Sequence, residues 1–149
     1  MLDWLRSLLK EPPPPIAVVD DPVLGRLTWD DDAEGWSGTL DGQAFILAYQ
    51  QAPEPTEELR KYASATLRER TMLDDGLRKE KEVLLAALRE SEGVRETVDE
   101  VRGLSYGSIT FLARGNVLGV FAELEGGRDH RCWRIEFAED ECVGMGCDT

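Results

Sequence analysis

The spacing of apolar residues changes twice along this chain of 149 residues, and this change constrains the fold more than any other feature. Apolar residues alternate with polar ones in short segments before about residue 50. They follow the 3.6-residue period of a helix over about 56–92, and alternate again after 105. Strands followed by helices and then by strands predict an α+β fold, with helices on one face of a mostly antiparallel sheet.

The first third of the chain predicts a meander of three antiparallel strands, over 24–29, 36–40 and 44–49. Asp41-Gly42, between the second and third strands, is a strong two-residue hairpin signal, because glycine tolerates the positive φ of a type I′ turn. Trp29 and Trp36 flank the preceding loop, and we expect them to form a packed cross-strand pair.

Two helices are expected in the middle of the chain, over 56–73 and 76–92. Thr56 is a suitable N-cap, and Asp74-Asp75-Gly76 interrupts the apolar stripe. This pattern fits either a helical hairpin or one kinked helix, and a further helical turn fits residues 94–101. The last third predicts C-terminal strands over 105–113, 117–124, 131–137 and 142–145.

Residues 1–15 are expected to lie outside the single α+β domain of residues 16–149. Leu2, Leu5, Leu8 and Leu9 share one face of an amphipathic helix over 2–10. The four prolines 12–15 then form a stiff, extended spacer. The helix is suited to docking a partner, as in an adaptor, to grazing a membrane, or to packing on its own domain.

The chain carries 30 acidic and 17 basic residues, which gives a formal net charge of −13. Such a field repels nucleic acid and anionic lipid and attracts basic partners. The longest apolar runs are too short for a transmembrane segment. Asp3, Arg6 and Lys10 interrupt any secretory signal, so we expect a cytoplasmic protein with reduced cysteines.

One histidine and three cysteines fall within 18 residues near the C-terminus. A hairpin centred on Glu139-Asp140 would pair Cys132 with Cys147 and turn Cys142 toward the core with Trp133, Ile135 and Phe137. His130, Cys132 and Cys147 would then lie on the other face. This division disfavours a four-ligand zinc site, but it leaves a redox pair or a weak metal site of three residues open beside three ordinary cysteines.

The segment Gly103-Leu104-Ser105-Tyr106-Gly107 matches the G-x-S-x-G motif of hydrolases. The motif needs a strand before it and a helix after it, whereas a strand-like segment follows here. We therefore expect a chance match and no catalytic serine.

The acidic loop after residue 29 resembles a calcium-binding loop in its spacing. Asp30, Asp32, Glu34, Gly35 and Asp41 fall at positions 1, 3, 5, 6 and 12 of an EF-hand loop. Position 12 lacks the bidentate glutamate and the flanks are strand-like, so an acidic hairpin tip is the favoured interpretation.

The stretch DPVLGRLTWDDDAEGWSGTL, residues 21–40, resembles the start of a family of small bacterial proteins of unknown function. Those proteins open with an Asp-Pro-x-Leu-Gly strand and a Trp-containing hairpin, followed by helices and a C-terminal sheet. Some lie beside toxin genes and are suspected immunity proteins. The resemblance implies the same α+β order and brings no catalytic motif.

The sequence therefore predicts a non-enzymatic, acidic protein-binding module without a cofactor, in its most concrete form an immunity or inhibitor protein that covers a basic surface. The residues expected to bind the partner are Asp30, Asp31, Asp32 and Glu34, with Asp74 and Asp75 second. One alternative is a thiol- or metal-dependent protein that uses His130, Cys132 and Cys147. Another is an adaptor that docks through residues 2–10.

Overall fold

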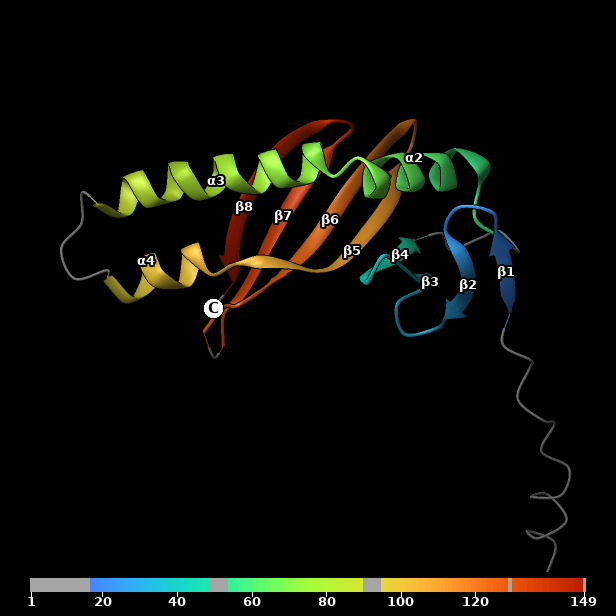
Figure 1. Cartoon of the computed structure of the whole chain (residues 1–149), viewed down its shortest axis with the longest axis horizontal. Helices are drawn as coiled ribbons and strands as arrows, with labels where there is room; N and C mark the ends of the chain where they lie inside the picture. The colour runs from blue at the N-terminus through green and yellow to red at the C-terminus, as the bar shows by residue number, and fades with distance from the viewer. Residues whose placement is uncertain (1–16, 49–53, 90–94, 129, 149) are drawn as a thin grey trace, which may run out of the picture.

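The structure is a computed structural model that describes residues 17–48, 54–89, 95–128 and 130–148. Within these residues the chain forms eight strands and three helices, in the order four strands, three helices, four strands (Figure 1). The predicted helix over 2–10 and the proline spacer lie outside the described residues.

The eight strands form one sheet, in which each strand lies beside its neighbours in the sequence. β4 and β5 run parallel, and the other neighbouring pairs are antiparallel. The strands are β1 (Val18–Asp21), β2 (Gly25–Asp30), β3 (Gly35–Leu40), β4 (Gln43–Ala48), β5 (Ser105–Arg114), β6 (Val117–Glu125), β7 (Cys132–Ala138) and β8 (Glu141–Asp148).

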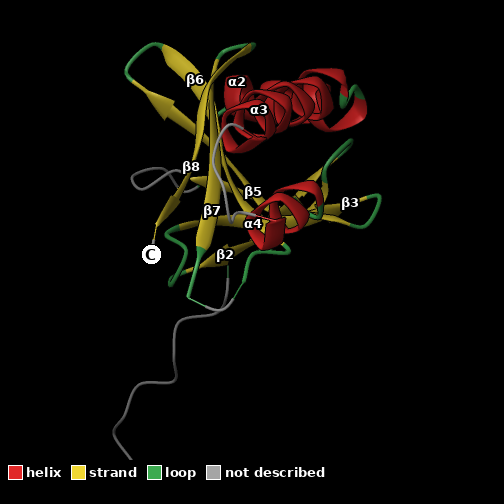
Figure 2. Cartoon of the chain, turned by 90° about the vertical axis from the view of Figure 1, so that its left-hand side faces the viewer, coloured by secondary structure: helices red, strands yellow, loops and turns green. Residues whose placement is uncertain are grey.

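The helices α2 (Glu57–Arg68), α3 (Thr71–Arg89) and α4 (Arg95–Arg102) lie between β4 and β5 in the sequence. Parallel neighbours need such a long crossover connection, because a tight turn joins only antiparallel strands. The helices gather on one side of the β5–β8 part of the sheet (Figure 2). Thr56 caps α2 as predicted, since its hydroxyl oxygen accepts a hydrogen bond from the Leu59 amide at 3.3 Å. None of the helices in the described residues is long and apolar enough to span a membrane.

The core lies between the helices and the face of the sheet that they cover. One row of directly paired residues crosses this face from β3 to β8: Trp36, Leu47, Phe111, Val120, Phe137 and Cys142. Leu59 and Ala63 of α2 and Leu73 of α3 are fully buried against the sheet. Burying these apolar side chains is the main force that holds helices and sheet together.

The predicted class, α+β with a mostly antiparallel sheet, is confirmed, but the predicted order of elements is incomplete. The N-terminal meander has four strands rather than three, because Val18–Asp21 pairs with β2 as an additional edge strand. Three helices rather than two lie between the strands, and the third, α4, lies where only a helical turn was expected.

The predicted break between the two central helices is wrong. Asp74, Asp75 and Gly76 lie inside α3, and the chain leaves helical geometry at Glu69, whose φ and ψ are −102° and 88°. Gly76 has a packing role instead. A Cβ at this position would lie 2.4 Å from Cε1 of Phe137, so the glycine lets α3 approach the sheet closely.

The N-terminal hairpins follow the prediction. Asp41 and Gly42 both have positive φ, 49° and 79°, as a type I′ turn requires. Trp29 and Trp36 are direct partners in β2 and β3, and their rings meet edge to face with centroids 5.6 Å apart.

The C-terminal hairpin departs from the predicted register. Phe137 pairs with Cys142 as expected, but a bulge on β8 shifts the pairing so that Ile135 faces Met145 and Trp133 faces Cys147. A one-residue shift moves each following side chain to the other face of the sheet. Cys147 therefore packs on the core side, where Cys142 also lies.

Candidate functional site

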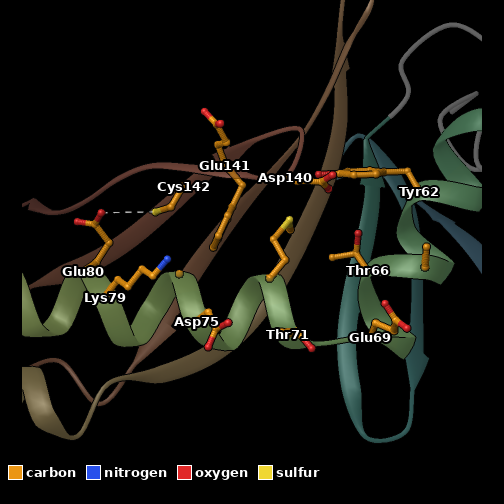
Figure 3. A pocket seen from close by; sticks show the side chains of 14 residues that line it. Tyr62, Thr66, Glu69, Thr71, Asp75, Lys79, Glu80, Asp140, Glu141 and Cys142 are labelled. Carbon is orange, nitrogen blue, oxygen red and sulfur yellow. Dashed lines mark hydrogen bonds between the residues drawn. The ribbon is translucent and has the colours of Figure 1, made fainter.

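A groove of about 770 Å³ lies between the α2–α3 junction and the tip of the β7–β8 hairpin. In Figure 3 the helices run along one side of the groove and the hairpin along the other. Tyr62 closes one end, and its hydroxyl donates a hydrogen bond to the backbone carbonyl of Glu139 at 2.7 Å. This bond joins α2 to the hairpin tip, so the two walls are held together.

The described residues that line this groove are strongly acidic. They include five carboxylates and one lysine: Glu69, Asp75, Glu80, Asp140, Glu141 and Lys79. Figure 3 shows the carboxylates distributed over both walls rather than gathered in one turn. A concave surface lined by one sign of charge concentrates its field, so cations are attracted into the groove.

The groove also has apolar surface beneath its carboxylates. Met72 of α3, Phe137 of β7 and Ala65 of α2 contribute to its lining. The Tyr62 ring packs edge to face on the buried Phe111, with centroids 5.9 Å apart. Burial and the nearby carboxylates of Asp140 and Glu139 raise the pKa of Tyr62 to about 12, so its phenol stays neutral. Such a lining suits the aliphatic stem of a lysine or arginine whose charged head reaches the carboxylates.

Cys142 lies in the groove wall opposite α3, and its thiol donates a long hydrogen bond of 3.7 Å to Glu80 (Figure 3). Burial raises the pKa of Cys142 to about 11, and the Glu80 charge adds to this effect. The thiolate is the nucleophilic form, so the raised pKa makes Cys142 a weaker nucleophile than an ordinary thiol at neutral pH. The groove therefore offers charge and shape but no activated thiol.

The acidic loop that was predicted to bind a partner lies at the β2–β3 turn, away from the groove (Figure 1). Asp30 and Asp31 accept hydrogen bonds that hold the turn. Asp30 accepts hydrogen bonds from the backbone of Asp32 and Ala33 at 3.0 and 3.2 Å. Asp31 accepts one from the Trp29 indole at 2.7 Å. Glu34 follows in a left-handed conformation with φ of 49°.

Asp74 and Asp75, which were also predicted to bind the partner, lie in different surroundings. Asp75 lines the groove, where it also forms an ion pair with Arg78 at 3.2 Å. Asp74 points elsewhere and pairs with Arg70 at 3.7 Å. The structure thus brings one of the six predicted residues into the groove.

The alternative site of His130, Cys132 and Cys147 is not assembled. Because of the bulge, Cys132 pairs with Asp148 while Cys147 pairs with Trp133, so their side chains leave opposite faces of the sheet. His130 lies in the loop before β7 with φ of 70°. Among the described residues, no group of three or more His, Cys, Asp or Glu side chains is arranged to hold a metal ion.

The fold also holds the residues of the calcium-loop pattern apart. Asp30 and Glu34 lie at one end of β3, and Asp41 lies at the other. Six extended residues span about 20 Å, so these oxygens cannot surround one ion. A strand follows Ser105 directly, so the G-x-S-x-G match lacks the helix that the hydrolase motif requires, as expected.

Most residues of the groove were missed because they come from two parts of the sequence, 62–80 and 137–142, that meet only in the folded chain. One signal was present. Met72, Asp75, Gly76, Lys79 and Glu80 recur at the spacing of a single helical face, which is the face of α3 beside the groove. The partner of that face, the turn around Asp140, lies about 60 residues further along the chain.

Comparison with known proteins adds no family to this description. No family model matches the chain, and neither does any curated protein or solved structure. The function of the groove must therefore be inferred from its own chemistry.

Proposed function

We propose that this protein is a non-enzymatic binding module that holds a basic segment of a partner protein in the α2–α3/β7–β8 groove. The observation that carries the proposal is the lining of the groove, with five carboxylates and one lysine around apolar surface. Arginine and lysine pair with carboxylates through charge-assisted hydrogen bonds, while their stems cover apolar groups. The net charge of −13 would accelerate the approach of such a partner.

The finer form of the proposal is an inhibitor or immunity protein that covers a basic surface. The groove supports this form because its walls come from elements tied together by the Tyr62–Glu139 hydrogen bond. A preformed site loses little conformational entropy on binding. The protonated state of Cys142 supports recognition rather than covalent chemistry.

The test is a titration with a fluorescently labelled octapeptide of alternating arginine and alanine, followed by anisotropy at low and moderate salt. A groove variant, Glu69→Gln with Glu141→Gln, removes two exposed carboxylates from the two walls. Each exposed ion pair contributes up to about 1 kcal/mol, so we expect affinity to fall about fivefold to tenfold. Binding should also weaken as salt rises.

Two matched variants separate the groove from other acidic surfaces. Asp31→Asn with Asp32→Asn removes two charges from the β2–β3 loop, and Asp20→Asn with Asp41→Asn removes two exposed charges elsewhere. Both should bind the peptide like the unmodified protein. A loss of peptide affinity confined to the Asp31/Asp32 variant would place the binding site in the β2–β3 loop. Equal losses of affinity in all three variants would show that the peptide responds only to the net charge of the protein.

A further inference from the structure

β8 is the last strand of the sheet, and among the described residues no strand pairs with its outer edge. Its bulge disturbs only the end beside the hairpin, and the pairing with β7 is regular over Gly144–Asp148. Natural sheets protect such edges with lysine, proline, a short strand or a covering element. β8 has eight residues and holds no lysine, arginine or proline, whereas β1, at the opposite edge, has only four residues and ends in two aspartates. The β8 edge is therefore the less protected of the two.

Two glycines leave room beside this edge. A Cβ at Gly144 or Gly146 would meet no atom within 4 Å, so the packing of the described residues does not require glycine there. Glycine weakens a strand, and it often marks a place where another backbone approaches closely. On the other face of β8, Met145 and Cys147 pack against the core but stay only partly buried. The core is thus incompletely covered at this edge.

The helix that covers β7 and β8 continues past the edge of the sheet (Figure 1). Gly76, Glu80 and Val83 lie on one face of α3, because steps of four and three residues complete successive turns. Gly76 lies against Phe137 of β7, and Glu80 accepts the hydrogen bond from Cys142 of β8. Val83 comes next on this face and is 68% exposed. Three helical residues advance about 4.5 Å, close to the spacing of about 4.8 Å between strands, so Val83 lies where a ninth strand would pass.

The second half of α3 carries apolar residues that the described structure does not bury fully. Residues 83–88 read Val-Leu-Leu-Ala-Ala-Leu, but the buried residues of the helix, Leu73, Gly76 and Leu77, all lie in its first half. Leu84 and Leu88 continue the stripe of Leu73 and Leu77 and are only partly buried. An apolar surface that continues beyond the sheet in this way is typical of a site that another chain covers.

We propose that β8 receives an extended segment of a partner protein as a ninth strand beneath the second half of α3. In this mode of recognition, backbone hydrogen bonds supply affinity and alternate side chains supply specificity. Apolar side chains of the incoming strand that point toward α3 would cover Val83 and Leu84. This surface is separate from the groove, whose lining includes no residue of α3 beyond Glu80 and none of β8 beyond Cys142.

The charges of β8 favour a segment with basic ends over a second copy of this protein. Glu141 and Asp148 stand at the two ends of the strand, with no basic residue between them. Arg134 of β7 pairs with Asp148 at 2.8 Å and offsets part of the charge at that end. If two copies paired along the whole of β8, two-fold symmetry would place Glu141 of each copy opposite Asp148 of the other. Like charges directly opposite destabilise paired strands, and lysine or arginine at the ends of the segment avoids this repulsion.

The test uses an acetylated heptapeptide, Lys-Val-Thr-Val-Thr-Val-Lys, in which apolar and polar residues alternate between basic ends. Its binding to the full chain is measured by NMR titration, together with amide hydrogen exchange. We expect the bound peptide to slow exchange at amides within Gly144–Asp148. The same peptide with N-methylated backbone amides should give no such protection and should bind about tenfold more weakly, because it cannot donate the strand hydrogen bonds.

A variant of α3 tests the predicted position of the strand. Val83→Gln should weaken binding of the heptapeptide about fivefold, because it removes an apolar contact above the incoming strand. Val18→Gln is the matched control, since Val18 is a 48% exposed valine on the opposite edge strand, and it should leave binding unchanged. Neither substitution should change binding of the arginine-alanine octapeptide, so the edge and the groove are tested separately.

Three results would overturn the proposal. The first is equal affinity for the methylated and unmethylated heptapeptides, or no measurable binding of either. The second is a Val83→Gln variant that binds like Val18→Gln. The third is protection of Gly144–Asp148 without peptide that grows with protein concentration while sedimentation shows a dimer, because a second copy would then be the occupant.

Discussion

Replacing Glu100 with glutamine should lower the free energy of unfolding by about 2 kcal/mol at neutral pH. The Glu100 side chain is 1% exposed. Its Oε1 accepts hydrogen bonds from the Trp133 indole at 2.8 Å and from the Arg128 amide at 3.0 Å, and its Oε2 accepts one from Arg131 at 2.8 Å. These bonds tie α4 to the loop between β6 and β7 and to the start of β7.

The magnitude follows from which bonds the amide of glutamine can keep. Its oxygen can still accept from Trp133 and Arg128, but its NH₂ group would face the donor on Arg131. One charge-assisted bond is lost, which costs about 1.5–3 kcal/mol. Glu100→Ala removes all three acceptor contacts and leaves the buried Trp133 indole and the partly buried donors of Arg128 and Arg131 without their acceptor, so it should cost about 3 kcal/mol.

The effect should depend on pH. Burial raises the pKa of Glu100, but the bonds from Trp133 and Arg128 and the charge of Arg131 lower it more, so the net pKa is below its ordinary value of 4.5. Between the folded and unfolded pKa values the unfolded chain binds more protons, so stability rises with pH there. The contribution is complete above pH 4.5 and is lost as the pH falls through the folded pKa.

Urea unfolding followed by circular dichroism measures these differences without relying on Trp133 fluorescence. Glu96→Gln is the matched control. It changes the same helix and removes a partner of Arg128, but its side chain is 76% exposed, so stability should stay unchanged. Equal midpoints for Glu96→Gln and Glu100→Gln would refute the argument. A Glu100→Gln deficit that persists undiminished at pH 3 would refute its ionic part.

Three further changes test the packing and the thiols. Gly76→Ala should destabilise the protein by about 1–3 kcal/mol, because the Cβ of alanine would collide with Phe137, and this cost exceeds the gain in helix propensity. Gly144→Ala is the control and should leave the melting temperature unchanged, since a Cβ there meets no atom within 4 Å. Iodoacetamide at neutral pH should label the exposed Cys132 before Cys142, whose pKa is raised to about 11. Peptide mapping measures the order of labelling, and earlier labelling of Cys142 would contradict the prediction. Tyr62→Phe should lower stability by about 1 kcal/mol through loss of its bond to Glu139, and an unchanged urea midpoint would contradict that role.

The sequence predicted those parts of the fold that depend on local rules. The change of period located the strands and helices, Asp41-Gly42 marked its turn, and Thr56 marked the start of α2. The break at Glu69 could not be predicted, because no glycine or proline stands there and Gly76 is present for a contact with a distant strand. The bulge on β8 likewise has no local signal, and it alone reversed the face of Cys147.

The candidate site was harder to predict than the fold, because its walls meet only through tertiary structure. Asp75 was identified by its charge, but the groove also needs the hairpin tip at Asp140 and the Tyr62 bond to Glu139. The predicted loop at Asp30 and Asp31 was chosen for its density of acidic residues. Part of that density serves the turn itself and the Trp29 indole.

The central claim is that the α2–α3/β7–β8 groove receives a basic segment, and amide chemical shifts measured during a titration with the arginine-alanine octapeptide test it most directly. The account predicts that the largest shifts fall on both walls, at Glu69, Asp75, Glu80 and Asp140, and disappear at high salt. Shifts centred on Asp31 and Asp32, or spread evenly over the acidic surface, would contradict it.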